Sequence, residues 1–172
     1  MNLITPSCVL RKWSDTDIPS LILHANHPEV AKWMRNGFPS PYTQKDAEHF
    51  IEMTTGDNCN LILAIDIRGE AIGGIGVHQL NDIYQKTAEI GYWLSPAFQG
   101  RGIVTDAVHA IIPVAFHELQ IIRIQAGVFH TNLPSIRVLE KNGFVLEAIH
   151  KNAICKNGQI FHECLYVTFH SE

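Results

Sequence analysis

The spacing of apolar residues changes several times along the chain, and each change predicts a new secondary-structure element. Near the N-terminus, Ser14 is followed by apolar residues three and four positions apart, as on one side of a helix. Two prolines between Gly37 and Pro41 predict a loop, because each proline lacks an N–H group and restricts the residue before it. This part of the chain predicts one strand and three helices: Ser7–Trp13, a helix after Ser14, Pro28 to about Met34, and Thr43 to about Met53.

After Asn60 the pattern becomes typical of strands, with short runs of β-branched and other apolar residues between turns. Helical spacing returns from Val104 to Leu119, where Pro113 predicts a kink or a shortened helix. A short helix is expected from Asn132 to Gly143. The predicted strands are Leu61–Ile67, Ala71–His78, Thr87–Leu94, Ile121–Phe129, Phe144–Ala153 and Ile160–Phe169.

The order of these elements predicts the fold class. The strand-helix-strand sequence from Thr87 to Phe129 implies two parallel neighbours joined by a right-handed crossover. The chain shows no internal repeat and no Ser/Gly linker. We therefore expect one α+β domain over residues 1–172, with a mixed, mostly antiparallel sheet and helices packed on it.

Composition and charge narrow the class of protein. At 172 residues, with 46% hydrophobic and 17% charged residues, the chain is too apolar for disorder, and no apolar run reaches the length of a membrane span. The net charge of −4 and the absence of a basic run argue against a nucleic-acid partner. No secretory signal is visible, so we expect a cytoplasmic protein. Four widely spaced cysteines predict reduced thiols and no metal site: Cys8, Cys59, Cys155 and Cys164.

The segment Gln99–Thr105 (QGRGIVT) is the clearest candidate for a binding site, because it joins a predicted strand to a predicted helix. Backbone N–H groups at such a helix start can hold a phosphate, and Gly100 and Gly102 let the backbone approach it closely. The alternative is an ordinary turn that uses glycine for its conformational freedom. Thr105 stands where a dinucleotide-binding motif needs its third glycine, and no Gly-Lys-Ser/Thr follows, so both of those motifs are excluded.

With this turn, several further motifs make the sequence similar to the GNAT N-acyltransferase superfamily, and most of all to its RimJ/RimL branch. That branch acetylates α-amino groups of ribosomal proteins, and relatives act on polyamines and antibiotics. The resemblance implies the GNAT fold, in which the two parallel central strands splay apart and helices cover both faces of the sheet. Its other motifs are His27–Val30 (HPEV), Pro39–Thr43 (PSPYT), Ala88–Leu94 (AEIGYWL), Asn132–Ser135 (NLPS) and Glu140–Phe144 (EKNGF).

The resemblance also implies acetyl-CoA as co-substrate, bound without a metal. The family's Gln/Arg-x-x-Gly-x-Gly/Ala turn maps onto Gln99, Gly102 and Val104, where valine replaces a small residue and could crowd the pyrophosphate. Asn132 faces the pantetheine arm by the same analogy, or simply caps a helix. The implied cofactor-binding residues are Leu94, Gln99, Gly100, Arg101, Gly102, Ile103, Val104, Thr105 and Asn132.

Three side chains are candidates for catalysis. Glu89 resembles the glutamate that acts as general base in some GNAT enzymes, with a solvated or salt-bridged carboxylate as the alternative. Ser135 could hydrogen-bond the sulfur of CoA, while Leu139 occupies the position where many GNAT enzymes carry a tyrosine acid. Among the histidines, His130 is the first choice, ahead of His78 and His162.

The expected function is transfer of an acetyl group from acetyl-CoA to a primary amine by direct attack. The amine is either a protein N-terminal α-amine or a small-molecule amine, and the protein is expected to be a monomer or homodimer. The alternatives are a polyamine or antibiotic acetyltransferase, a catalytically weak acyl-CoA-binding or regulatory module, and a plain nucleotide-binding domain. Fold alone does not identify the acceptor, which depends on surface loops.

Overall fold

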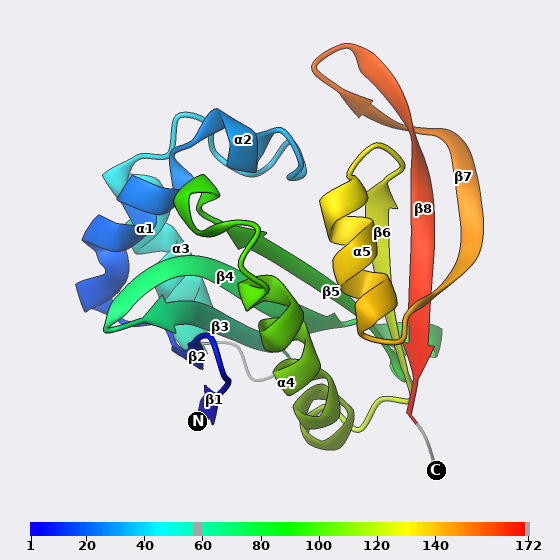
Figure 1. Cartoon of the computed structure of the whole chain (residues 1–172), viewed down its shortest axis with the longest axis horizontal. Coiled ribbons are helices and arrows are strands. Elements are labelled where there is room, and N and C mark those ends of the chain that lie inside the picture. The colour runs from blue at the N-terminus through cyan, green and yellow to red at the C-terminus, as the bar shows by residue number, and fades with distance from the viewer. Residues whose placement is uncertain (57–59, 171–172) are drawn as a thin grey trace.

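The computed structural model describes residues 1–56 and 60–170, which form an eight-stranded sheet flanked by five α-helices (Figure 1). The sheet order is β1-β2-β3-β4-β5-β6-β8-β7. Every neighbouring pair is antiparallel except β5 and β6, which are parallel. The strands are β1 Asn2–Ile4, β2 Val9–Lys12, β3 Asn60–Ile67, β4 Glu70–Gln79, β5 Thr87–Leu94, β6 Arg123–Phe129, β7 Val145–Lys156 and β8 Gln159–Phe169. The helices are α1 Ile18–Ala25, α2 Pro28–Ala31, α3 Gln44–Gly56, α4 Ile103–Glu118 and α5 Leu133–Lys141.

This architecture confirms the α+β class and the mixed, mostly antiparallel sheet. The predicted bounds of β5 are those observed, whereas β1 was not predicted, because three residues are too short to show an alternating pattern. Of the kink or shortened helix expected at Pro113, the shortened helix is wrong, since α4 continues to Glu118, and the kink stays a prediction. Ile111 and Ala115, on either side of the proline, are fully buried, and this packing holds the helix together across the lost hydrogen bond.

Helices cover both faces of the sheet, and each face has its own apolar core. One core packs α4 and α5 against the sheet and includes the buried side chains of Ile111 and Leu139. The other lies under α1 and α3 and includes Leu21 and Ile51. The central strands therefore have side chains directed to two different layers, one on each face.

The two parallel strands separate before they end. Their ladder runs only from the pair Thr87 and Arg123 to the pair Glu89 and Gln125, although β5 continues to Leu94 and β6 to Phe129. Beyond that point β5 stays paired with β4, and β6 stays paired with β8. Figure 1 shows the two strands diverging. This opening, which we call the splay, lies in the centre of the sheet.

Glycines in β4 allow the adjoining strand to lie close, as their place in a strand predicts. A Cβ atom on Gly73 would lie 2.5 Å from the carbonyl oxygen of Trp93. A Cβ on Gly74 would lie 2.8 Å from the indole nitrogen of the same tryptophan. A side chain at Gly73 would push the β5 backbone away from β4, whereas one at Gly74 would displace the Trp93 indole.

Three further features bear on the class of protein. Within residues 1–56 and 60–170, no helix combines the length and apolarity that crossing a membrane requires. The three cysteines in the described residues, Cys8, Cys155 and Cys164, are free, and Cys59 lies outside those residues. Burial raises the pKa of the Cys8 thiol, which makes it less reactive at neutral pH.

Candidate active site

The glycine turn leads directly into α4 and presents backbone donors. Gly100 and Gly102 have φ angles of 75° and 79°, in the left-handed region that glycine adopts without strain. The first helical hydrogen bond runs from the Asp106 N–H to the Gly102 carbonyl, at 3.0 Å. The N–H groups of Ile103, Val104 and Thr105 precede that bond, so they remain available to an external acceptor. The geometry fits an anionic phosphate at the positive end of the helix dipole.

The Gln99 and Arg101 side chains of the turn are hydrogen-bonded to backbone carbonyl groups of the same protein. Gln99 donates its amide N–H to the Leu94 carbonyl at 3.0 Å, which ties the turn to the end of β5. The Arg101 guanidinium donates to Ala97 O at 2.9 Å and lies over the Phe98 ring. Val104 packs against the core rather than over the turn, which argues against the crowding expected from its sequence position. The backbone is therefore the part of this segment that faces a ligand.

Substitution of Gly102 tests this turn. Gly102→Val places a β-branched residue at φ 79°, so we expect the turn to distort and the Kd for acetyl-CoA to rise by about tenfold or more. Isothermal titration calorimetry measures the change. Gly69→Val is the matched control, because Gly69 has a φ of 86° and open space around it but lies in the β3–β4 turn. Equal affinities for both variants would contradict this role of the glycine turn.

A backbone donor also points into the splay. The Ser95 N–H donates to Ile72 O on β4, at 2.9 Å. Successive N–H groups of a strand point to opposite sides, so the Leu94 N–H points away from β4, toward β6. The β5–β6 ladder has already ended there. This donor has the orientation required to stabilise a carbonyl oxygen that gains negative charge within the splay.

The start of α5 adds a pair of hydroxyl groups. Asn132 caps the helix by accepting the Ser135 N–H at 3.4 Å, which confirms its capping role. The Ser135 hydroxyl lies 2.8 Å from the phenol oxygen of Tyr92 on β5. Burial raises the pKa of Tyr92 to about 12, so this phenol keeps its proton at physiological pH. Sequence reasoning gave Tyr92 no role of its own and missed this contact, which depends on how α5 packs.

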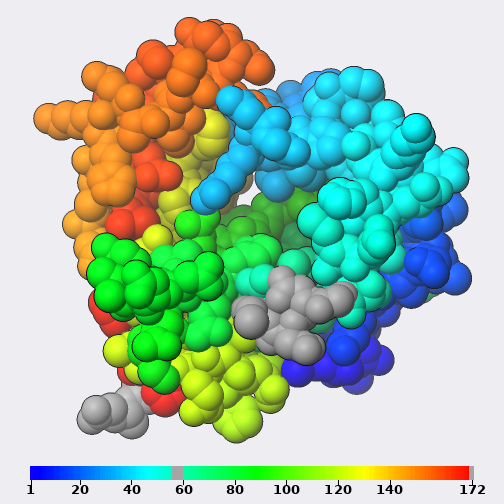
Figure 2. Space-filling view, turned by 180° about the vertical axis from the view of Figure 1, so that it is seen from behind, coloured from blue at the N-terminus to red at the C-terminus, as the bar shows by residue number. Residues whose placement is uncertain are grey.

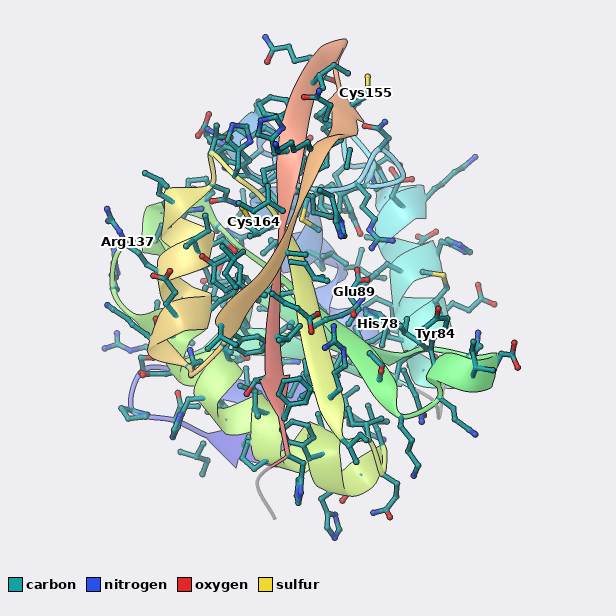
Figure 3. The ribbon with its side chains drawn as sticks, turned by 90° about the vertical axis from the view of Figure 1, so that its right-hand side faces the viewer. His78, Tyr84, Glu89, Arg137, Cys155 and Cys164 are labelled. Atoms are coloured by element: carbon teal, nitrogen blue, oxygen red, sulfur yellow. The ribbon has the colours of Figure 1, made fainter. Side chains whose placement is uncertain are left out.

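Glu89 lies on the opposite face of the sheet from Tyr92, because alternate residues of β5 point to opposite sides. It belongs to the last β5–β6 pair before the splay. Its side chain is about one-third exposed and forms an ion pair with Arg35, in the loop after α2. On β4 its partner in the sheet register is His78, and Figure 3 shows the two residues side by side. The salt-bridged carboxylate, which was the alternative to a general base at Glu89, is therefore observed. The ion pair with Arg35 holds this carboxylate at the edge of the splay.

His130 follows β6, on the side of the β7–β8 hairpin. Its Nδ1 atom lies 3.1 Å from the His162 backbone N–H and 3.3 Å from the His162 carbonyl oxygen, and the two rings lie 4.8 Å apart. The first contact needs an unprotonated Nδ1 and the second a protonated one, so either tautomer of the imidazole has a partner here. Glu89 belongs to the last β5–β6 pair before the splay, so it is the candidate base used below, and His130 stays a prediction.

The fold thus brings the predicted site residues to one opening from two faces. Tyr92 and Ser135 lie on the α4–α5 face, and Glu89 and Arg35 lie on the other. The glycine turn begins where β5 ends. A parted parallel strand pair, followed by a helix start with free backbone N–H groups, is the arrangement expected of acyl-CoA-dependent N-acyltransferases.

Comparisons with known proteins agree with this class. The family model described as an acetyltransferase (GNAT) domain matches residues 8–145, and the chain belongs to this family of N-acetyltransferases. Within the family it is similar to the RimJ/RimL ribosomal branch. The probable N-acetyltransferase YjcK of Bacillus subtilis is 39% identical over 67% of this chain and 58% of its own length.

Two further relatives have more specific descriptions. The ribosomal-protein-serine acetyltransferase of Escherichia coli is 37% identical over 49% of this chain and 46% of its own length. The chain thus spans about half the length of YjcK and of this enzyme. The microcin C7 self-immunity acetyltransferase MccE, solved in complex with acetyl-CoA and AMP, is 28% identical, with a TM-score of 0.82 over 95% of this chain and 93% of that one.

Proposed function

We propose that this N-acetyltransferase transfers an acetyl group from acetyl-CoA to a primary amine by direct nucleophilic attack. The observation that carries the proposal is the splay, which has a carboxylate on one face and a pair of hydroxyls on the other. Acetyl-CoA approaches from the α4–α5 face, with its phosphates at the glycine turn. The amine approaches from the face of Glu89. The two substrates then meet within the sheet without a covalent enzyme intermediate.

Each step of the transfer has a candidate group. The amine nitrogen attacks the thioester carbonyl carbon, whose oxygen accepts a hydrogen bond from the Leu94 N–H. Glu89 takes a proton from the attacking amine, directly or through water, after Arg35 releases its carboxylate. The carbon–sulfur bond then breaks. The departing thiolate takes a proton through the Ser135 hydroxyl or from solvent, and the products are an amide and CoA.

Tyr92 positions Ser135 in this scheme. Removing the phenol oxygen in Tyr92→Phe leaves the Ser135 hydroxyl without its partner at 2.8 Å, so we expect kcat to fall about three- to tenfold. The KM for acetyl-CoA should change less than twofold, because the glycine turn is untouched. Steady-state assays with a thiol reagent measure both constants. Tyr84→Phe is the control, since Tyr84 is 61% exposed. An unchanged kcat for Tyr92→Phe would contradict the positioning role of Tyr92.

The acceptor is a protein N-terminal α-amine or a small-molecule amine. The first class is supported by the similar ribosomal-protein-serine acetyltransferase, and the second by MccE, which was solved in complex with acetyl-CoA and AMP. A screen of CoA release against N-terminal peptides, polyamines, aminoglycosides and small amines separates these classes. Release with at least one class supports the proposal. Acetyl-CoA binding without release for any amine would favour a regulatory acyl-CoA-binding module instead.

A further inference from the structure

A cavity of about 280 Å³ lies between the loop after α2 and the β7–β8 hairpin. None of the sequence motifs pointed to it, because its walls come from segments about 120 residues apart. The lining includes two lysines and no carboxylate, although the chain as a whole is acidic. Such a lining is complementary to a negatively charged group. The residues that line it are Lys32, Trp33, Lys156, Asn157, Gln159 and Phe161.

Lys156 supplies the positive charge of the cavity that no carboxylate neutralises. Its ammonium group donates to Met34 O at 2.8 Å, which holds the half-buried side chain in place. In the part of the chain that the structure describes, no carboxylate forms an ion pair with it. By contrast, the half-buried cations Arg11 and Arg123 each pair with a carboxylate. A fixed ammonium with one carbonyl partner keeps two N–H donors for an anion.

The walls of the cavity are aromatic. Trp33 and Phe161 both line it, and Phe129 packs edge-on against each, with ring centroids 5.6 and 5.3 Å apart. Lys32 lies 5.0 Å from the Trp33 ring and is paired with Glu29, so its charge is already compensated. Aromatic rings in the wall of a cavity can pack against a planar group. The cavity thus combines two aromatic residues with one cation that no carboxylate of the described residues pairs with.

The cavity adjoins the acceptor face of the splay. Trp33 and Arg35 belong to the same short loop: the first lines the cavity, and the second forms the ion pair with Glu89. The Lys156 contact with Met34 ties this loop to the hairpin from the other side. Figure 2 shows the light-blue segment in contact with the orange β7–β8 hairpin. A ligand in the cavity would therefore lie beside the loop that carries the partner of the candidate base.

We infer that this cavity is an acceptor subsite that binds an anionic planar group, so the acceptor is a small primary amine that carries a carboxylate or phosphate on a flat ring. The inference rests on the proposed function and makes its acceptor class more specific. Lys156 binds the anion, Trp33 and Phe161 contact the ring, and the amine extends toward Glu89. A polyamine is disfavoured, because its cationic chain would meet the ammonium of Lys156.

A matched pair of probes tests the inference. 4-(Aminomethyl)benzoate and 4-(aminomethyl)benzamide differ only in the charge of one group. The 4-(2-aminoethyl) analogues of both compounds have a longer arm and cover a greater distance between the ring and the reacting amine. In the wild-type protein we expect kcat/KM and binding affinity to favour the carboxylate at least tenfold in one of the pairs. Binding is measured by calorimetry with CoA present, and transfer by thiol release. Spermidine is assayed beside them and should be the poorer acceptor.

Variants of Lys156 assign the preference to the cavity. Lys156→Gln should reduce the carboxylate preference, taken as the ratio of the two kcat/KM values, to about one. Lys156→Arg keeps the positive charge and should retain most of the preference. Lys151→Gln is the matched control, because Lys151 is an exposed lysine of the same hairpin. Equal binding and use of carboxylate and amide in the wild type, or a preference for spermidine, would overturn the inference. Carboxylate-selective binding without thiol release would instead refute the proposed transfer and leave the subsite standing.

Discussion

Replacing Glu89 with glutamine is expected to lower kcat by about 100-fold or more, the scale of a lost general base. Glutamine keeps the size of the side chain, and its amide oxygen can still accept from Arg35, but it cannot take a proton from the attacking amine. The fold and the glycine turn are unaffected, so the Kd for acetyl-CoA should stay within twofold. Steady-state thiol release and calorimetry measure the two quantities on the same preparation.

Two controls separate this role from a general effect of charge. Glu52→Gln removes a carboxylate from an exposed position on α3 and should leave kcat unchanged. Arg35→Gln removes the partner of Glu89 without removing the base, so its kcat should fall much less than that of Glu89→Gln. A Glu89→Gln variant with wild-type kcat at saturating amine would show that another group, such as His130 or solvent, accepts the proton.

The second large effect concerns stability, at a buried ion cluster outside the site. Arg11 on β2 binds both oxygens of Asp17 at 2.7 Å and donates its Nε–H to Asp66 at 2.8 Å. The two aspartates are 3% and 5% exposed. Arg11→Met leaves two buried carboxylates without their cation, and we expect it to lower the free energy of unfolding by about 3 to 5 kcal/mol. Urea denaturation of the ligand-free protein at neutral pH measures the loss.

The pH dependence of that loss has a definite sign. Burial raises the pKa of Asp17, but hydrogen bonds from Arg11 and Ser14 outweigh it and lower the pKa below its ordinary value of 3.8. In the wild type this contribution to stability is present above the ordinary pKa and is lost as pH falls through the lowered pKa. Without Arg11 burial dominates and favours the protonated carboxyl, so the deficit of the variant should shrink toward pH 4.

The control for the cluster is Arg137→Met, which removes the same charge from an exposed position on α5 and should change stability by less than about 0.5 kcal/mol. A loss in Arg11→Met that is no larger than this, or one that grows on acidification, would contradict the cluster's role.

Local pattern was sufficient to predict most elements of the fold. The bounds of β5 and the parallel crossover through α4 follow from alternation and from helical spacing, which depend on neighbouring residues. β1 was missed because its three residues gain their structure from pairing with β2. The helical spacing from Val104 to Leu119 gave the extent of α4 closely, and the shortening expected at Pro113 does not occur, because the buried residues around the proline outweigh its local cost.

The candidate site was predictable where it depends on contiguous residues and hidden where it depends on distant ones. The glycine turn and the Asn132 cap are local, and both were identified from sequence. The contact of Tyr92 with Ser135 and the ion pair of Glu89 with Arg35 join residues 43 and 54 positions apart. The cavity at Lys156 joins segments farther apart still, 122 positions at its contact with Met34. The periodic pattern of apolar residues does not reveal such pairs, because only tertiary packing brings them together.

The central claim is that the splay performs amine-dependent acetyl transfer, and release of CoA thiol from acetyl-CoA tests it most directly. The rate is measured with the wild type and with Glu89→Gln, each with and without a panel of primary amines. The account predicts release that requires an amine, saturates with its concentration and falls about 100-fold or more in the variant. Tight acetyl-CoA binding with no amine-dependent release from the wild type, for any amine in the panel, would contradict it.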